Sequence, residues 1–155
     1  MNETEKFLNL SGDGIRCAVG ILVNNGRILI GHRHYTKDKW KDVSVWTIPG
    51  GRSDAGETIE QTLRREVEEE VGITKLEIKD FIGEVAGAKE GDIVLIFYCL
   101  TTDDAKLMEP EKFSEWKWIS VDEYVSEEKY SGFNSPAKRM IINYLKSVNN
   151  LEATS

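Results

Sequence analysis

Residues 49–73 read PGGRSDAGETIEQTLRREVEEEVGI, a glycine-rich stretch followed by apolar residues at helical spacing. The Pro-Gly-Gly start and the small polar residues after it favour loop conformations until a helix begins near Glu57. Beyond that point an apolar side chain recurs at every fourth position, which places one stripe of the helix against a core. The stripe consists of Ile59, Leu63, Val67 and Val71. Gly72 is expected to end the helix, because glycine readily adopts the left-handed conformation of a C-terminal cap.

Three carboxylates stand on one face of this predicted helix, since Glu66, Glu69 and Glu70 occupy positions i, i+3 and i+4. Each like-charged pair costs about 0.2–0.5 kcal/mol. The last turns of a helix add about 0.3–1 kcal/mol per anion. A divalent cation removes both penalties, and an all-oxygen ligand set suits Mg²⁺, with Mn²⁺ as the second choice. The alternative is that this acidic run is only a solvated helix face.

The spacing within this stretch matches the Nudix box, G-x5-E-x7-R-E-U-x-E-E-x-G-U, where U is a bulky aliphatic residue. The match runs without departure from Gly51 to Ile73. The chain therefore resembles the Nudix hydrolases, and in particular their MutT-like branch, over about residues 14–148. The resemblance implies an α/β fold in which a mixed sheet lies between helices, an α/β/α sandwich. It also implies an Mg²⁺-dependent enzyme that cleaves a nucleoside diphosphate linked to another group X by attack of water on phosphorus.

The resemblance assigns roles to residues of the box. Glu66, Glu69 and Glu70 are implied as metal ligands and catalytic carboxylates. One of them, with Glu66 as the first candidate, also orients or deprotonates the attacking water. Gly50 and Gly51 are implied in substrate binding, and the carbonyl oxygen of one of them, Gly50 in the first instance, completes the metal coordination.

Three further residues of the box have structural roles in the family. The counterparts of Glu57 and Arg65 form a salt bridge that holds the loop to the helix, although Glu57 also has the alternative of reaching the metal through water. Gly72 closes the helix. These positions are therefore expected to shape the site without taking part in the reaction.

Candidates outside the box are fewer. Arg33 follows a predicted strand, at a position whose MutT-type counterpart contacts the substrate. In the stretch EPEKFSEWKW, residues 109–118, Glu111 is a candidate for a further metal ligand, with Glu109 as the less favoured choice and an ordinary acidic loop as the alternative. Asn134 occupies the place of a base-reading asparagine, but an asparagine before Ser-Pro also serves as a cap or turn residue.

Length and charge limit the possible partners. The 155 residues predict a single domain, 1–155, with an ordered core over about 14–148 after an irregular arm. The net charge is −7, which argues against a general surface for a nucleic acid polymer or an anionic membrane. Positive charge near the site gathers in residues 32–41. We expect a small nucleotide as partner, in a monomer or homodimer.

Cysteine content and hydropathy bear on the compartment. Cys17 and Cys99 are far apart, and each lies in an apolar run, so buried thiols are expected. The sequence shows no signal peptide or long apolar span. These features favour a cytoplasmic protein.

The remaining elements follow from apolar runs and turn residues. Strands are expected at 15–23, 27–31, 45–48, 75–86, 92–101 and 112–120, with an Asn-Asn-Gly hairpin turn at 24–26. A short acidic helix is expected at 121–125, and a last helix from Ser135-Pro136.

Three functions are compatible with this pattern. The favoured one is a (d)NTP pyrophosphohydrolase that releases a nucleoside monophosphate and pyrophosphate. A hydrolase of nucleotide sugars or dinucleoside polyphosphates on the same scaffold is the first alternative, and a non-catalytic nucleotide sensor is the second. The sensor is disfavoured because every carboxylate of the box is present.

Overall fold

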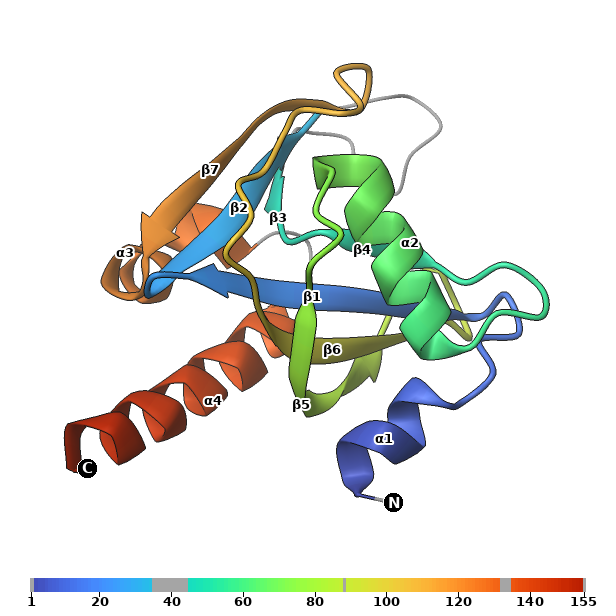
Figure 1. The fold of residues 1–155 in the computed structure, drawn as a ribbon, viewed down its shortest axis with the longest axis horizontal. Helices are drawn as coiled ribbons and strands as arrows, with labels where there is room; N and C mark the ends of the chain where they lie inside the picture. Colours follow the sequence, from blue (N-terminus) through green and yellow to red (C-terminus); the bar gives the residue numbers. More distant parts are fainter. Residues whose placement is uncertain (1, 35–44, 88, 132–134, 155) are drawn as a thin grey trace.

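The computed structural model describes residues 2–34, 45–87, 89–131 and 135–154 (Figure 1). Within these residues, seven strands form one mixed sheet and helices cover both of its faces. In chain order the elements are α1 (Glu3–Leu8), β1 (Arg16–Asn24), β2 (Arg27–Arg33), β3 (Val45–Thr47), β4 (Gly50–Arg52), α2 (Ile59–Val71), β5 (Glu77–Ala86), β6 (Ile93–Leu100), β7 (Phe113–Ser120), α3 (Val121–Ser126), the 3-10 helix η1 (Glu128–Ser131) and α4 (Ser135–Thr154).

Strand β1 is the centre of the sheet. On one side it runs parallel to β6 from Arg16 to Val23. Its other side is shared, because β4 pairs with residues 17–19 and β2 pairs only with residues 23 and 24. Strand β2 pairs antiparallel with both β3 and β7, and β5 pairs antiparallel with β6. The glycine-rich strand β4 is thereby inserted beside the centre of the sheet, and α2 packs against both β1 and β4.

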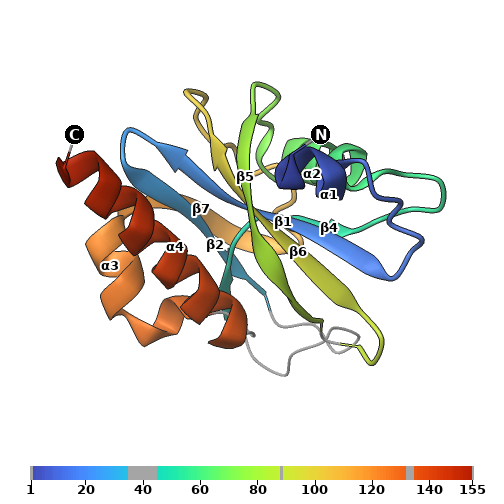
Figure 2. The same ribbon diagram turned by 90° about the horizontal axis from the view of Figure 1, so that it is seen from below.

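The two faces of the sheet carry separate cores. Figures 1 and 2 show α2 and α1 on one face and α4 with α3 on the other. The buried strand β6 serves both, since Leu95 and Phe97 face the α2 side while Val94 and Ile96 face the α4 side. On α2, the whole predicted stripe is buried, with Ile59, Leu63, Val67 and Val71 at 0% exposure. The predicted α/β/α sandwich is confirmed.

Most expected elements are present with small shifts at their ends. The Asn-Asn-Gly turn joins β1 to β2 with Asn25 at φ 52° and Gly26 at φ 75°, the positive values that a tight hairpin needs. The final helix begins at Ser135 and runs to Thr154. It buries Ile141 and Leu145 as expected.

The start of the chain differs from the expected irregular arm. Residues 3–8 form α1, capped by the Asn2 side chain, which accepts a hydrogen bond from the Glu5 N–H at 2.8 Å. Phe7 stacks on Phe81 with ring centroids 4.0 Å apart, and Leu8 is buried. Apolar contacts on β5 therefore order a segment whose own sequence is too short to predict a helix.

The glycine-rich stretch also differs from expectation. Gly50–Arg52, expected as a turn, pairs with β1 as strand β4. Helix α2 starts at Ile59, two residues later than expected, because Thr58 is its N-cap. Gly72 closes it in the left-handed conformation at φ 70°, as predicted.

Among the described helices, none combines the length and the apolar character needed to cross a bilayer.

Candidate active site

The entrance of α2 is fixed by a capping box. The Thr58 hydroxyl accepts a hydrogen bond from the Gln61 N–H at 3.2 Å, and the Gln61 side chain accepts one from the Thr58 N–H at 2.9 Å. Because Thr58 caps the helix, Glu57 remains part of the loop. The Glu57 carboxylate does not cap the helix and binds Arg65, Thr62 and the Asp54 N–H.

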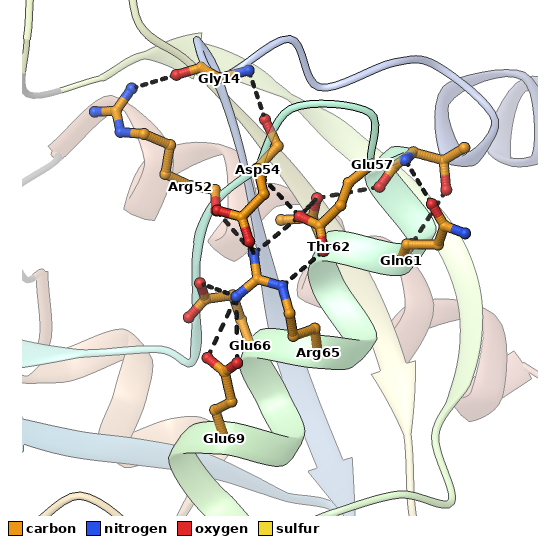
Figure 3. A network of polar contacts seen from close by, with 11 residues as sticks. Gly14, Arg52, Asp54, Glu57, Gln61, Thr62, Arg65, Glu66 and Glu69 are labelled. Atoms are coloured by element: carbon orange, nitrogen blue, oxygen red, sulfur yellow. Dashed lines mark hydrogen bonds and ion pairs between the residues drawn. The ribbon is translucent and has the colours of Figure 1, made fainter.

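Glu57 and Arg65 form the salt bridge expected from the sequence (Figure 3). The Arg65 guanidinium donates to both Glu57 oxygens, from Nε at 2.6 Å and from Nη2 at 2.9 Å. The same carboxylate accepts from the Asp54 N–H at 2.8 Å and from the Thr62 hydroxyl at 3.0 Å. The hydrogen bond from Arg65 is the main cause that lowers the pKa of Glu57 to about 2. The pair joins the loop to the second turn of α2.

This pKa predicts a pH dependence of stability in the metal-free protein. A carboxyl whose folded pKa is lowered contributes its full stabilisation above its unfolded pKa, about 4.5, and loses it as the pH falls toward the folded value of about 2. The difference in free energy of unfolding between wild type and Glu57→Gln is therefore expected to be largest above about pH 4.5 and to shrink below it. Urea unfolding at several pH values in EDTA measures this difference.

The matched control is Glu60→Gln, on the same helix. Glu60 accepts from Arg64 at 2.9 Å, but both side chains are exposed, so this ion pair contributes little stability. A Glu57→Gln difference that stays constant down to pH 3 would contradict the prediction.

Arg65 also contacts the two carboxylates that follow it on α2. Its Nη1 donates to Glu66 at 3.0 Å and to Glu69 at 3.3 Å, while Nη2 donates to the Arg52 carbonyl at 3.1 Å (Figure 3). One guanidinium therefore links strand β4, the loop and the acidic face of the helix. The three glutamates of the predicted cluster are not equivalent, because Glu69 is 49% exposed and points to Arg65.

Glu66 lies against the bare backbone of β4. A Cβ atom placed on Gly51 would come within 2.6 Å of the Glu66 carboxyl carbon, so glycine is required for this close approach. Burial raises the pKa of Glu66, while the charge and the hydrogen bond of Arg65 oppose that rise. The Glu66 carboxylate is thus held between the Arg65 guanidinium and Gly51 of β4, which has no side chain.

Glu70 is the most buried of the three carboxylates, with 4% of its surface exposed. It accepts a hydrogen bond from the Gly50 N–H at 2.9 Å. Burial raises the pKa of Glu70 to about 8, against the opposing effect of this hydrogen bond, and the charges of Glu66 and Glu109 raise it further. Arg33 is the nearby positive charge that lowers it.

Three of the candidate residues outside the box lie in the part of the chain that the structure describes. Arg33 lies at the end of β2, over the Phe113 ring at 5.5 Å and close enough to Glu70 for its charge to act there. Glu109, less favoured from the sequence, is half-buried beside Glu70 and pairs with Lys112 at 3.3 Å. Glu111 is exposed in the same turn, so its role as a ligand remains a prediction.

Other candidates fall outside the residues that the structure describes. Asn134 is one of them, and so are the loop lysines Lys37, Lys39 and Lys41. Their contribution to substrate binding stays a prediction.

Sequence reasoning missed two features. Arg52 of β4 forms a bidentate ion pair with the buried Asp92, with distances of 2.8 and 2.5 Å. Lys112 adds positive charge near Glu66. An arginine directly after Gly-Gly and a lysine directly before a strand were the available signals, but neither one indicates its partner.

The two cysteines match their sequence reading only in part. Cys99 is buried, and burial raises its pKa to about 12, whereas Cys17 is partly exposed and its pKa is raised chiefly by burial.

The donor set fits a hard divalent cation by its chemistry. Glu66, Glu70 and Glu109 are all oxygen donors. The repulsion from Glu66 and Glu109, which adds to the larger effect of burial in raising the pKa of Glu70, is the kind that a cation relieves. The predicted cluster is nonetheless not closed. In residues 2–34, 45–87, 89–131 and 135–154, no three Asp, Glu, His or Cys side chains are gathered tightly enough to hold a metal ion as they stand. The guanidinium of Arg65 supplies the positive charge next to Glu66 and Glu69.

Comparison with known proteins agrees with this geometry. The NUDIX domain family matches residues 14–141. The chain is 33% identical over 135 residues to an RNA pyrophosphohydrolase of Wolbachia sp. subsp. Brugia malayi, covering 74% of this chain and 80% of that protein. It is 29% identical over 132 residues to an 8-oxo-dGTP diphosphatase of Buchnera aphidicola subsp. Schizaphis graminum, covering 84% and 92%.

Solved structures share the fold. A MutT protein from Methanosarcina mazei Go1 superposes with a TM-score of 0.65 at 23% identity, covering 88% of this chain and 94% of that one. An Ap4A hydrolase from C. elegans gives a TM-score of 0.67 at 19% identity, covering 86% and 98%.

A sheet split around β1, the glycines of β4 beside the buried Glu70 and the partly buried Glu66, and a family match over most of the chain define one class: this chain belongs to the Nudix hydrolase family. It is a MutT-like member and a hydrolase of phosphorus anhydrides.

Proposed function

We propose that the chain is a metal-dependent (d)NTP pyrophosphohydrolase that cleaves between the α- and β-phosphates. The observation that carries this proposal is the arrangement of Glu66 and Glu70 over the glycines of β4, with Arg33 close to Glu70. Carboxylates and cations at one place suit phosphoryl transfer, which needs charge neutralisation more than covalent help. The named 8-oxo-dGTP diphosphatase relative supports a free triphosphate as substrate.

Each side chain has a role in this proposal. Glu66, Glu70 and Glu109 would hold Mg²⁺ or Mn²⁺, with Glu69 as a further ligand; the cation, when bound, would neutralise phosphate oxygens and lower the pKa of water. Glu66 orients the attacking water and accepts its proton. The water oxygen bonds to the α- or β-phosphorus, the bond from that phosphorus to the oxygen bridging the two breaks, and a monophosphate and pyrophosphate separate. Arg33 binds the phosphates through its planar guanidinium.

A second candidate substrate is the 5′-triphosphate end of RNA. It contains the same anhydride, and a relative of this chain at 33% identity is named an RNA pyrophosphohydrolase. The acidic net charge of −7 disfavours extensive contact with a polymer. Recognition would therefore be confined to the first nucleotides.

A substrate panel tests both candidates. Purified protein is incubated with each NTP and dNTP, 8-oxo-dGTP, a nucleotide sugar, Ap4A and a short 5′-triphosphate RNA, in Mg²⁺, Mn²⁺ or EDTA, and the products are resolved by chromatography. We expect monophosphate and pyrophosphate from at least one free triphosphate, and no turnover in EDTA. Orthophosphate as the sole inorganic product would contradict the cleavage position. A preference for the RNA end over every free nucleotide would favour the second candidate.

A further inference from the structure

A short segment before β1 lies against the loop that leads into α2. The Gly12 N–H donates to the Glu57 carbonyl at 2.9 Å, and the Ile59 N–H donates to the Leu10 carbonyl at 2.9 Å. Ser11 and Thr58 between them form an isolated antiparallel bridge. Residues 10–12 thus pair antiparallel with residues 57–59 through one β-bridge and two backbone hydrogen bonds.

The next residues of the segment bind the start of the same loop. The Gly14 N–H donates to the Ser53 hydroxyl at 3.1 Å, and Arg52 donates to the Gly14 carbonyl at 3.0 Å (Figure 3). The Ser53 N–H donates to the Arg16 carbonyl at 3.0 Å. Both ends of the loop from Ser53 to Glu57 are therefore attached to residues 10–16.

Gly12 is where this contact is tightest. A Cβ atom on Gly12 would lie 2.1 Å from Cβ and 2.2 Å from Oγ of Ser53, a residue that is only 3% exposed. The third nearest atom, the Glu57 carbonyl oxygen, would be at an ordinary 3.6 Å. Ser53 alone therefore excludes a side chain at position 12, and the backbone of Gly12 lies outside the left-handed region.

Arg65 connects the loop from Ser53 to Glu57 with the Glu66 carboxylate. The segment holds the backbone of Glu57, the Glu57 carboxylate binds Arg65 through two hydrogen bonds, and Arg65 donates to Glu66. Every link is a direct contact of 3.0 Å or less. A shift of the loop must therefore move the guanidinium that faces Glu66.

We propose that residues 10–14 are a positioning segment for the catalytic carboxylates, with Gly12 as its critical positioning residue. Residues 10–13 of this segment precede residue 14, where the NUDIX family match begins, so most of the segment lies outside the matched region. The consequence for turnover rests on the proposed function, whereas the consequence for Arg65 does not. Neither Gly12 nor Ser53 touches the substrate in this scheme.

The test is Gly12→Ala with its compensating change. The added methyl group displaces Ser53, whereas Ser53→Gly removes the atoms that it meets, so Gly12→Ala/Ser53→Gly has room for the methyl group. The control is Gly83→Ala, whose Cβ would lie 2.2 Å from the Met140 sulfur on the opposite face of the sheet. It also introduces a steric clash but leaves the loop untouched.

Three readouts separate positioning from general destabilisation. In metal-free protein, the Arg65 Nε–H resonance reports the hydrogen bond to Glu57. Titration with Mn²⁺ alone, followed by electron paramagnetic resonance, gives the metal affinity, which is expected to fall about 10-fold in Gly12→Ala, the order of effect for residues that orient ligands. At saturating metal, kcat is expected to fall about 100-fold, as for an ångström-scale misplacement, with a much smaller change in KM.

The outcomes are separable. A shifted Arg65 resonance and weaker Mn²⁺ binding in Gly12→Ala, recovered in the double variant and absent in Gly83→Ala, support the proposal. An unchanged resonance and affinity in folded Gly12→Ala overturn it. If Gly12→Ala does not fold, Ser53→Ala, which only removes the hydrogen bond to Gly14, must show the same changes in weaker form or the proposal fails. If wild type hydrolyses no nucleotide, the proposed function fails while the resonance still decides the role of the segment.

Discussion

Replacing Glu66 by Gln is expected to lower kcat/KM for triphosphate hydrolysis by about 100-fold or more, because one ligand charge and the group that orients water are lost together. Glu66 is packed on Gly51, so the isosteric amide remains in place and the loss is one of charge. Steady-state kinetics at saturating Mg²⁺ measures the effect. The control is Glu68→Gln, an exposed glutamate two positions along the same helix, which should retain nearly full activity.

The same pair of variants tests metal binding without turnover. Metal that binds only the folded protein at 100 times its Kd stabilises it by about 2.7 kcal/mol. Mg²⁺ or Mn²⁺ should therefore raise the Tm of wild type and Glu68→Gln by similar amounts, and that of Glu66→Gln by less. Equal shifts in all three proteins would place the metal away from Glu66.

Replacing Gly50 by Ala is expected to have the largest effect on stability. Gly50 has φ 146°, and its added Cβ would lie 2.2 Å from the Ala18 carbonyl oxygen and 2.5 Å from the Val19 Cα, which are backbone atoms of the central strand. Neither can move without disturbing the pairing of β1 and β4. Backbone strain together with a clash of this kind places the expected loss at about 3 kcal/mol or more, in the upper range of single substitutions.

The activity of Gly50→Ala should fall together with its stability, since the Gly50 N–H is the hydrogen-bond donor to the buried Glu70. Urea unfolding and nucleotide hydrolysis measure the two effects. The control is Gly26→Ala in the β1–β2 turn, where φ is 75° but no atom lies within 4 Å of the added Cβ, so strain is present without a clash. If Gly50→Ala were no less stable than Gly26→Ala, β4 would be able to shift and accommodate the added methyl group, and the prediction would be wrong.

Local sequence predicted the elements whose signals lie within a few residues of one another. The hairpin turn at 24–26, the buried stripe of α2 and the Gly72 cap all follow from neighbouring residues, and all are present. Strand β6 is buried on both faces, as its continuous apolar run indicates. In each case the structure is determined by residues that are close together in the sequence.

Predictions failed where the cause acts between distant residues. Helix α1 depends on Phe81, and strand β4 depends on its pairing with β1, so neither is visible in its own residues. The environments of Glu109 and Glu111 also depend on the tertiary structure. Glu109 is partly buried and its charge acts on Glu70, whereas Glu111 is exposed, and which of the two binds metal remains a prediction.

For this protein the sequence by itself determined the helix that carries the site and the chemistry of its donors. With about 3.6 residues per turn, Glu66 and Glu70 must share a face next to the buried stripe. Only the tertiary structure decided which carboxylates are buried. Strand β4 packs on one side of that face and covers Glu66 and Glu70, whereas Glu69, one position before Glu70, is rotated away from the strand and remains half exposed beside Arg65. The helical period fixes the relative directions of the side chains, but the strand that buries Glu70 and partly covers Glu66 is placed there by its pairing with β1.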